Sequence, residues 1–204
     1  MSTLAPSTIR GRLQFILLAT LFVGPFLASY IFYFYFPQSR PEGRTNYGEL
    51  ILPVQEAFAL ELKDANGQAQ SERLFTRRWT LLTVADARCD EDCENHLLMS
   101  RQVRLALNEK RVRVQRALLL LDGDNLEAIS ERLSEAHPQL SIVALESGAL
   151  PEPLKSLTQT DSLAFFIDPH GNWVMRYPVG RERQSDFKGM QKDIKKLLRL
   201  SQIG

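Results

Sequence analysis

The sequence predicts one α/β domain that follows a single membrane-spanning helix. An uncharged apolar run near the start predicts the helix, and short apolar runs of strand length recur in the rest of the chain. Between these runs, apolar residues repeat every 3.6 positions, which favours helices packed on a central sheet. The charges nearly balance, with 25 Lys and Arg against 24 Asp and Glu, so the composition does not favour a nucleic-acid partner.

The apolar run extends from Leu13 to Phe36 and contains no charged residue. At about 1.5 Å per residue it is long enough to cross a hydrocarbon core of about 30 Å. A cleaved signal peptide would have an apolar core of roughly 7–15 residues and a small-residue cleavage site. This run is longer and ends in YIFYFYF, an aromatic cluster typical of a membrane–water boundary. We therefore expect residues 13–36 to span a membrane.

The orientation of this helix in the membrane is inferred from the charged residues on its two sides and from the lengths of the flanking segments. Arg10 and Arg12 precede the run, whereas Arg40 and Arg44 follow it and are offset by Glu42, so the positive-inside rule is nearly balanced. The short lead and the large C-terminal part favour residues 1–12 in the cytoplasm and a single-pass inner-membrane protein. Residues 37–48 are expected to be a tether and residues 49–204 a periplasmic domain, where a disulfide can persist.

The apolar patterns after Glu49 predict a short hairpin-like stretch followed by the order β-α-β-α-β-β-α. The hairpin-like stretch covers 58–70 and turns at Asn66-Gly67. Strands are expected at 79–86, 116–122, 141–146, 162–168 and 173–180, and a loop with room for one helical turn at 147–160. Each of the three expected helices has one apolar face. The first face consists of Met99, Val103, Ala106 and Leu107, and the second of Leu126, Ile129 and Leu133. The third helix starts at Asp186, and its apolar face consists of Phe187, Met190, Ile194, Leu197 and Leu198.

The two cysteines of the chain, Cys89 and Cys93, fall between the first core strand and the helix that follows it. We expect Cys89 just before the helix and Cys93 in its first turn, where free backbone N–H groups favour a thiolate. On a regular helix such a pair has Cα atoms about 6 Å apart, near the upper end of the range of about 4.4–6.8 Å for disulfides. A bridge between the two cysteines is therefore possible.

Four acidic residues surround the cysteines: Asp90, Glu91, Asp92 and Glu94. Their charge disfavours a nearby thiolate, but it would attract a cation held by two sulfurs, and thiolate ligands suit Cu(I). Acidic residues also belong in the first turn of any helix. The pattern therefore leaves open a redox pair, a copper site and a structural bridge.

A metal site with the two cysteines would need a further ligand, and the chain has three histidines. His96 lies one turn after Cys93 and is the candidate ligand, although a histidine at such a position is more often an exposed helix residue. His137 is expected at a helix end before a proline. His170 falls in the turn DPHG, where its role is conformational.

Several stretches resemble the Sco/SenC family of cytochrome c oxidase assembly proteins. They are RRWTLLTVADARCDEDC, RALLLLDGDN and AFFIDPHGNWVMRYPVG, combined with the membrane anchor, the tether and a basic C-terminal helix. The resemblance covers about 49–200 and implies a thioredoxin-like fold with a central mixed sheet flanked by helices. It also implies that Cys89 and Cys93 bind copper or exchange a disulfide while the copper A centre of the oxidase is built.

The chain departs from that family pattern in two places. The family has a proline shortly after its second cysteine, whereas Glu94 and Asn95 stand here. The family's copper-binding histidine comes nine residues before Pro169, and this position holds Thr160. The chain is thus identified as a divergent member that lacks the usual copper ligand, whereas a dithiol–disulfide function does not need that ligand.

We expect three functions, in decreasing order of preference. The first is assistance of copper A assembly by a thiol–disulfide oxidoreductase activity of Cys89 and Cys93, with the inner membrane and a cytochrome c oxidase subunit or assembly factor as partners. The second is a Cu(I) chaperone that uses Cys89, Cys93 and His96. The third is a scaffold protein in which the bridge is static.

Overall fold

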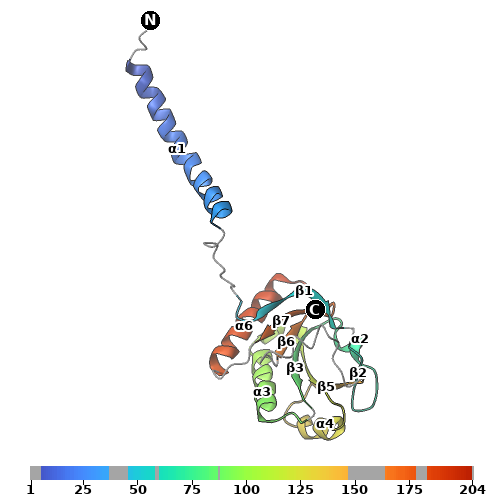
Figure 1. Cartoon of the computed structure of the whole chain (residues 1–204). Helices are drawn as coiled ribbons and strands as arrows, with labels where there is room; N and C mark the ends of the chain where they lie inside the picture. The colour runs from blue at the N-terminus through green and yellow to red at the C-terminus, as the bar shows by residue number, and fades with distance from the viewer. Residues whose placement is uncertain are drawn as a thin grey trace. The chain divides into compact units, whose positions relative to one another are not determined.

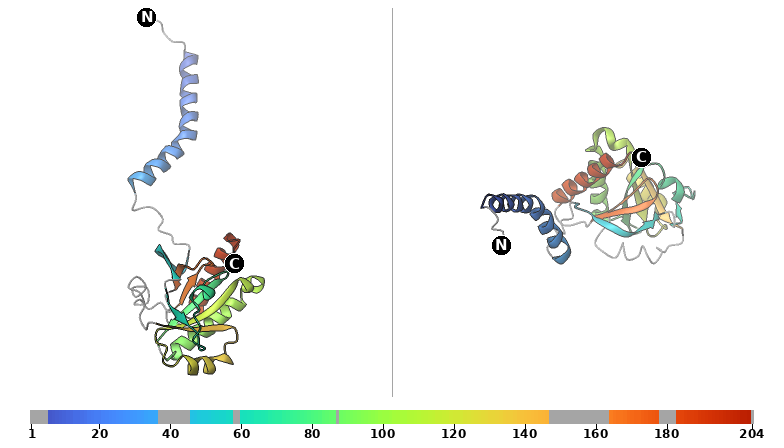
Figure 2. Two further views of the ribbon diagram at one scale, coloured as in Figure 1. Left: turned by 90° about the vertical axis from the view of Figure 1, so that its right-hand side faces the viewer. Right: turned by 90° about the horizontal axis from the view of Figure 1, so that it is seen from above.

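The computed structural model describes residues 6–36, 46–57, 60–86, 88–146, 164–177 and 183–203. The chain divides into two units, Met1–Arg44 and Thr45–Gly204 (Figure 1). The first contains helix α1 (Pro6–Tyr35), whose segment Arg10–Tyr35 is long and apolar enough to cross a membrane and contains an 18-residue stretch with a mean hydropathy of 2.1. Figure 2 shows α1 bent, and Pro25, which has no N–H to donate, is the proline inside it.

The second unit is built on a seven-stranded mixed sheet with the order β1-β7-β6-β3-β4-β5-β2. Strand β3 pairs in parallel with β4 and β4 with β5, whereas the other neighbours are antiparallel. The strands are β1 (Glu49–Glu56), β2 (Leu62–Lys63), β3 (Trp79–Ala85), β4 (Val114–Leu120), β5 (Leu140–Leu145), β6 (Ala164–Ile167) and β7 (Asn172–Tyr177). The expected central mixed sheet flanked by helices is confirmed.

Three helices pack on one face of this sheet: α3 (Glu91–Leu105), α4 (Leu126–Ser134) and α6 (Arg183–Leu200). Right-handed crossovers from β3 to β4 and from β4 to β5 place α3 and α4 on the same side. In Figure 1, α6 lies beside α3, and buried Val103 of α3 shares a cluster with Ile194 and Leu198 of α6. The opposite face is covered by the segment around α2 (Ser71–Leu74), with Phe75 fully buried against Leu82 and Phe165.

Both edges of the sheet differ from the sequence expectation. Strand β1 was not expected, because its apolar side chains Leu50, Leu52 and Val54 are exposed and Pro53 interrupts it; as an edge strand it tolerates the proline. The expected turn at Asn66-Gly67 is present, with an antiparallel bridge from Lys63 to Ala69. Strand β2 nevertheless pairs with β5 at the far edge, and residues 58–59 of the expected hairpin lie outside the described residues.

The boundaries of two helices also differ from those expected from the sequence. Helix α3 ends at Leu105, so Ala106 caps it and Leu107 is buried beyond it, before a 3-10 helix at Asn108–Arg113. Helix α6 begins at Arg183 rather than Asp186. The loop expected at 147–160 lies outside the described residues.

The second unit begins before Glu49 because Tyr47 and Gly48 pack on α6. The Gly48 N–H donates to Asp193 Oδ2 at 2.8 Å, and the Tyr47 hydroxyl hydrogen-bonds Asp186. Gly189 leaves room for the Tyr47 ring, since a Cβ there would lie 2.1 Å from Tyr47 Cγ. Residues 46–48, expected within the tether, therefore form the first part of the folded unit.

Candidate functional site

Cys89 and Cys93 lie at the junction between the end of β3 and the start of α3, joined by a disulfide. Their Cα atoms are 5.1 Å apart, well inside the range of about 4.4–6.8 Å that disulfides span. The distance is shorter than on a regular helix because Cys89 precedes the helix and has a left-handed φ of 46°. Cys93 lies in the first turn, so the structure places both cysteines where the sequence pattern predicted them.

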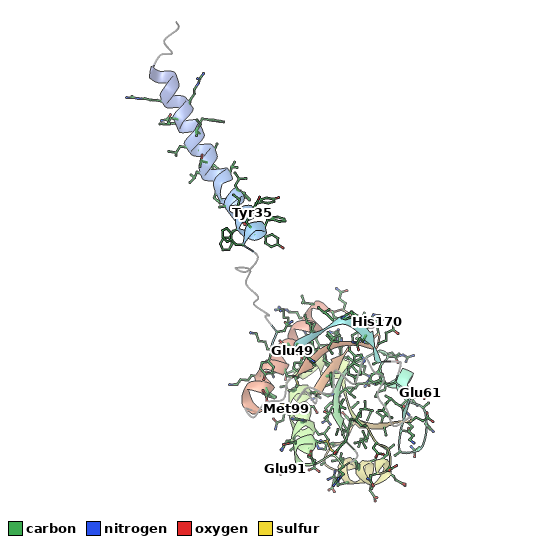
Figure 3. The ribbon with its side chains drawn as sticks, viewed as in Figure 1. Tyr35, Glu49, Glu61, Glu91, Met99 and His170 are labelled. Atoms are coloured by element: carbon green, nitrogen blue, oxygen red, sulfur yellow. A yellow bond between two sulfur atoms is a disulfide. The ribbon has the colours of Figure 1, made fainter. Side chains whose placement is uncertain are left out.

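The acidic residues around the cysteines begin the helix. Asp90 is the N-cap of α3, and its carboxylate accepts a hydrogen bond from the Cys93 N–H at 3.0 Å. Glu91 and Asp92 are exposed in the first turn, where negative charge complements the helix dipole. Figure 3 labels Glu91 at this end of α3. Asp90 therefore caps the helix, and the charges of Glu91 and Asp92 are favourable at its N-terminus.

Arg132 on α4 holds the loop that carries Cys89. Its Nη2 donates to the carbonyl oxygens of Arg88 at 3.0 Å and Cys89 at 2.9 Å, and its Nη1 pairs with Glu94 Oε1 at 2.6 Å. One guanidinium thus connects α4, the loop and the first turns of α3. Because Arg132 is 43 residues downstream of Cys89 in the sequence, no local pattern could have identified it.

Both cysteines are buried, at 1% exposure for Cys89 and 2% for Cys93. They share an apolar cluster with Leu97 of α3 and with Leu118 and Leu120 of β4. Thiol–disulfide exchange requires a thiolate to reach a sulfur atom. A partner can therefore reach this bridge only after a local opening of the chain around it.

The histidines do not complete a metal site in the described part of the chain. The expectation of an exposed His96 is wrong: it is 8% exposed, because the inward face of α3 starts at Cys93 and position 96 lies on it. His137 is also buried, and burial, with the nearby charges of Arg116 and Arg101, lowers its pKa. Among the described residues, no group of three His, Cys, Asp or Glu side chains could hold a metal ion.

His170 lies at the other end of the domain from Glu91 (Figure 3). Strand β6 runs antiparallel to β3, so the turn after β6 falls at the start of β3 and away from the cysteines. The His170 N–H and the Asn172 N–H both donate to Asp168 Oδ1, and Gly171 has a φ of 81°. These contacts shape a turn, which agrees with the expected conformational role.

A family model described as transmembrane-like, thioredoxin-like, C-terminal domain matches residues 79–201. This match extends from β3 through both cysteines to the end of α6 and covers more than half of the chain. The chain belongs to this thioredoxin-like family. The comparison with curated proteins found no match.

Solved structures with the same fold include Sco proteins. Yeast Sco1 with copper bound has a TM-score of 0.57 and 17% identity, covering 78% of this chain and 96% of that protein. The solution structure of apo Sco1 from Thermus thermophilus has a TM-score of 0.54 and 18% identity, covering 78% and 98%. Arabidopsis thaliana ScoI with copper bound has a TM-score of 0.51 and 20% identity, covering 74% and 99%. At these identities the likeness shows the thioredoxin-like fold.

The thioredoxin-like domain also buries a cation beneath α3 that the sequence patterns did not indicate. Arg116 lies in β4 at 2% exposure, and its Nη1 donates to the carbonyl oxygen of Leu97 at 3.2 Å. Burial, with the charges of Arg104 and Arg101, lowers its pKa to about 10. Arg116 thus places a positive charge under the helix that carries Cys93.

We expect Arg132→Gln to lower the free energy of unfolding by about 1 kcal/mol, because the two carbonyl groups of the Cys89 loop lose their donor. The ion pair with Glu94 contributes little, since both side chains are partly exposed. Glu94→Gln removes the ion pair, keeps the carbonyl contacts and serves as the matched control. Denaturant unfolding of the full chain measures both variants, and equal losses would contradict the role given to the carbonyl contacts.

Proposed function

We propose that this protein is a membrane-anchored thioredoxin-like thiol–disulfide oxidoreductase that assists the assembly of the copper A site of cytochrome c oxidase. The observation that carries the proposal is the disulfide between Cys89 and Cys93 at the β3–α3 junction. A cysteine pair at the start of a helix in such a fold is typical of redox sites, because the free N–H groups of the first turn stabilise a thiolate.

In this proposal Cys89 and Cys93 are the catalytic residues. When the pair is reduced, one thiolate attacks a client disulfide and forms a mixed disulfide, and one client sulfur leaves as a thiolate. The second cysteine then attacks the mixed disulfide, which closes the Cys89–Cys93 bridge and releases the client as a dithiol. Two electrons pass from the pair to the client, and the reverse sequence oxidises a client dithiol.

The proposed location follows from the apolar helix. Residues 13–36 span the inner membrane and residues 1–12 lie in the cytoplasm. Residues 49–204, together with residues 46–48 that pack on them, form the periplasmic domain. The hydropathy of Arg10–Tyr35 supports a spanning helix, and an oxidising compartment allows the disulfide to persist. The proposed partners are a cytochrome c oxidase subunit or an assembly factor on the same side of the membrane.

The sequence motifs resembling the Sco/SenC family and the fold shared with Sco proteins support the choice of pathway. They support a divergent member of that family, in which Thr160 stands at the place of the copper-binding histidine. Thr160 lies outside the described residues.

Copper as cargo is the second candidate function, favoured by the copper bound to yeast Sco1 and Arabidopsis thaliana ScoI. Two thiolates fit Cu(I), whereas the described residues supply no third ligand for a three-donor site. Cys89 and Cys93 would hold the ion once the bridge is reduced. Anaerobic titration of the reduced full chain with Cu(I) decides this, because binding no tighter than that of a Cys89→Ala/Cys93→Ala control would exclude copper delivery.

A static bridge in a scaffold protein is the third candidate, and the burial of both cysteines favours it. A structural disulfide packed in an apolar cluster stabilises a fold without reacting. The reduction potential separates this candidate from the redox function.

In cells, we expect Cys89→Ser and Cys93→Ser each to lower the activity of copper-loaded cytochrome c oxidase severalfold. Each variant removes one sulfur, so no bridge can form or exchange. Asp92→Asn is the control, because Asp92 is exposed in the same turn and its replacement leaves both sulfur atoms in place. Oxidase activity in membranes is the measurement, and full activity in both serine strains would exclude the redox role.

A further inference from the structure

A cavity of about 480 Å³ lies at the opposite end of the sheet from the cysteines. Its lining includes Gln115 and Ser141, each near the start of a parallel strand, and Arg78, which directly precedes β3. The cysteines follow the other end of β3. Seven strand residues at about 3.3 Å each place the two sites about 20 Å apart, so this cavity is distinct from the disulfide.

Three arginine residues line the cavity, and all three are exposed to solvent: Arg73, Arg77 and Arg78. Within the described residues, none of the three forms a salt bridge. The hydrogen bond from Gln68 N to the Asp64 carboxylate is the main cause of the lowered pKa of Asp64, and the charge of Arg73 adds to it. The same carboxylate also accepts hydrogen bonds from Asn66 N and Gln70 Nε2. The cavity therefore concentrates positive charge that the described acidic residues do not neutralise by direct contact.

Two of these arginines, Arg77 and Arg78, are consecutive in the chain, and both line the cavity. In an extended chain, consecutive side chains point to opposite sides. Arg77 has a left-handed φ of 69°, uncommon for a residue with a side chain, and both Arg77 and Arg78 line the cavity. The turn is held by hydrogen bonds from Arg77 N to Pro169 O at 3.3 Å and from Arg78 N to Thr76 O at 2.9 Å. Such backbone conformations are concentrated at functional sites.

Apart from Leu74, the other residues that line the cavity are polar: Gln70, Thr76, Gln115 and Ser141. Gln115 Nε2 donates to the carbonyl oxygen of Leu74 and to Thr80 Oγ1, which fixes this side chain. Thr76 and Ser141 line the same cavity, and a hydroxyl group can donate a hydrogen bond to an anion.

We propose that this cavity binds a phosphate-bearing ligand, with the phosphate group among Arg73, Arg77 and Arg78. Guanidinium groups bind phosphate oxygens in a planar, bidentate geometry, and three of them match a phosphate better than the single charge of a carboxylate. The volume falls in the range of about 300–1,000 Å³ that small-molecule sites have, so the ligand carries an organic part beside its phosphate. This inference is independent of the proposed redox function.

The same phosphate chemistry occurs in soluble phosphorylated molecules and in anionic lipid headgroups. Isothermal titration calorimetry on the full chain in a neutral detergent tests both sources with two probes, glycerol 3-phosphate and short-chain dihexanoyl phosphatidylglycerol below its micelle concentration. We expect saturable binding of at least one probe. Similar affinities for the two probes would show that a soluble phosphorylated molecule is sufficient for binding. At least tenfold tighter binding of the lipid would identify an anionic lipid headgroup as the ligand.

The variant Arg77→Gln/Arg78→Gln is expected to weaken this binding at least tenfold. The control Lys195→Gln/Arg199→Gln removes two exposed cations from α6 and is expected to bind within twofold of the unmodified chain. If the first variant does not fold, Arg73→Gln alone is expected to weaken binding at least threefold. Absence of saturable binding for both probes, or arginine variants that bind like the control, would overturn the proposal.

Discussion

Replacing both cysteines by alanine is expected to abolish thiol–disulfide exchange and to lower the free energy of unfolding by about 2 kcal/mol relative to the oxidised chain. The value follows from the loop-closure entropy of a bridge that encloses only five residues, Cys89 to Cys93. For a domain of this size it corresponds to a fall in Tm of about 4–8 °C. Exchange with glutathione and thermal unfolding of the full chain measure the two effects.

The reduced unmodified chain is the control for this variant. Reduction removes the same crosslink, so its Tm should fall close to that of Cys89→Ala/Cys93→Ala, and adding reductant to the variant should change nothing. If reduction leaves the Tm of the unmodified chain unchanged, the bridge does not constrain the fold as the structure indicates.

Gly48→Ala is expected to lower the free energy of unfolding by about 1–3 kcal/mol, as other overpacked core positions do. A Cβ at residue 48 would lie 2.6 Å from Tyr177 Cε1 and 3.0 Å from Met175 Cε. Tyr177 is fully buried, so its ring has no free space to move into. The shift would also weaken the hydrogen bond from Gly48 N–H to Asp193, a buried carboxyl whose pKa burial already raises.

Gly67→Asn is the matched control for this substitution. Gly67 lies in an exposed turn with a φ of 74°, a Cβ there meets nothing within 4 Å, and asparagine tolerates the left-handed conformation. Chemical denaturation should show a smaller loss for the control than for Gly48→Ala. A Gly48→Ala chain as stable as the unmodified one would contradict the close packing of Gly48 against Tyr177 and Met175 of β7.

Strong local patterns predicted the centre of the fold. Strand β3 is buried at every position from Trp79 to Ala85, and its continuous apolar sequence is typical of a central strand. Strand β1 was missed because pairing with β7, rather than its own pattern, makes it a strand: Glu49 pairs with Arg176. Such an edge contact joins residues more than a hundred positions apart, and no local periodicity encodes it.

Some features of the candidate site could likewise be predicted from local sequence, and others could not. The position of the cysteine pair and the acidic helix start follow from local sequence, because capping depends on a few consecutive residues. The contacts of Arg132 and the burial of His96 and Arg116 depend on how α4 and β4 pack against α3. A polar residue in an amphipathic helix is normally assigned to solvent, so only tertiary structure could place His96 inside.

The central claim is that the Cys89–Cys93 bridge is a reversible redox couple, and its reduction potential tests this most directly. The full chain is equilibrated with a series of dithiothreitol redox buffers, and the fraction of free thiol is read by alkylation and mass spectrometry. The proposed function predicts a potential between about −270 and −120 mV, the range of exchange proteins. A potential below about −300 mV, as structural disulfides have, would contradict it.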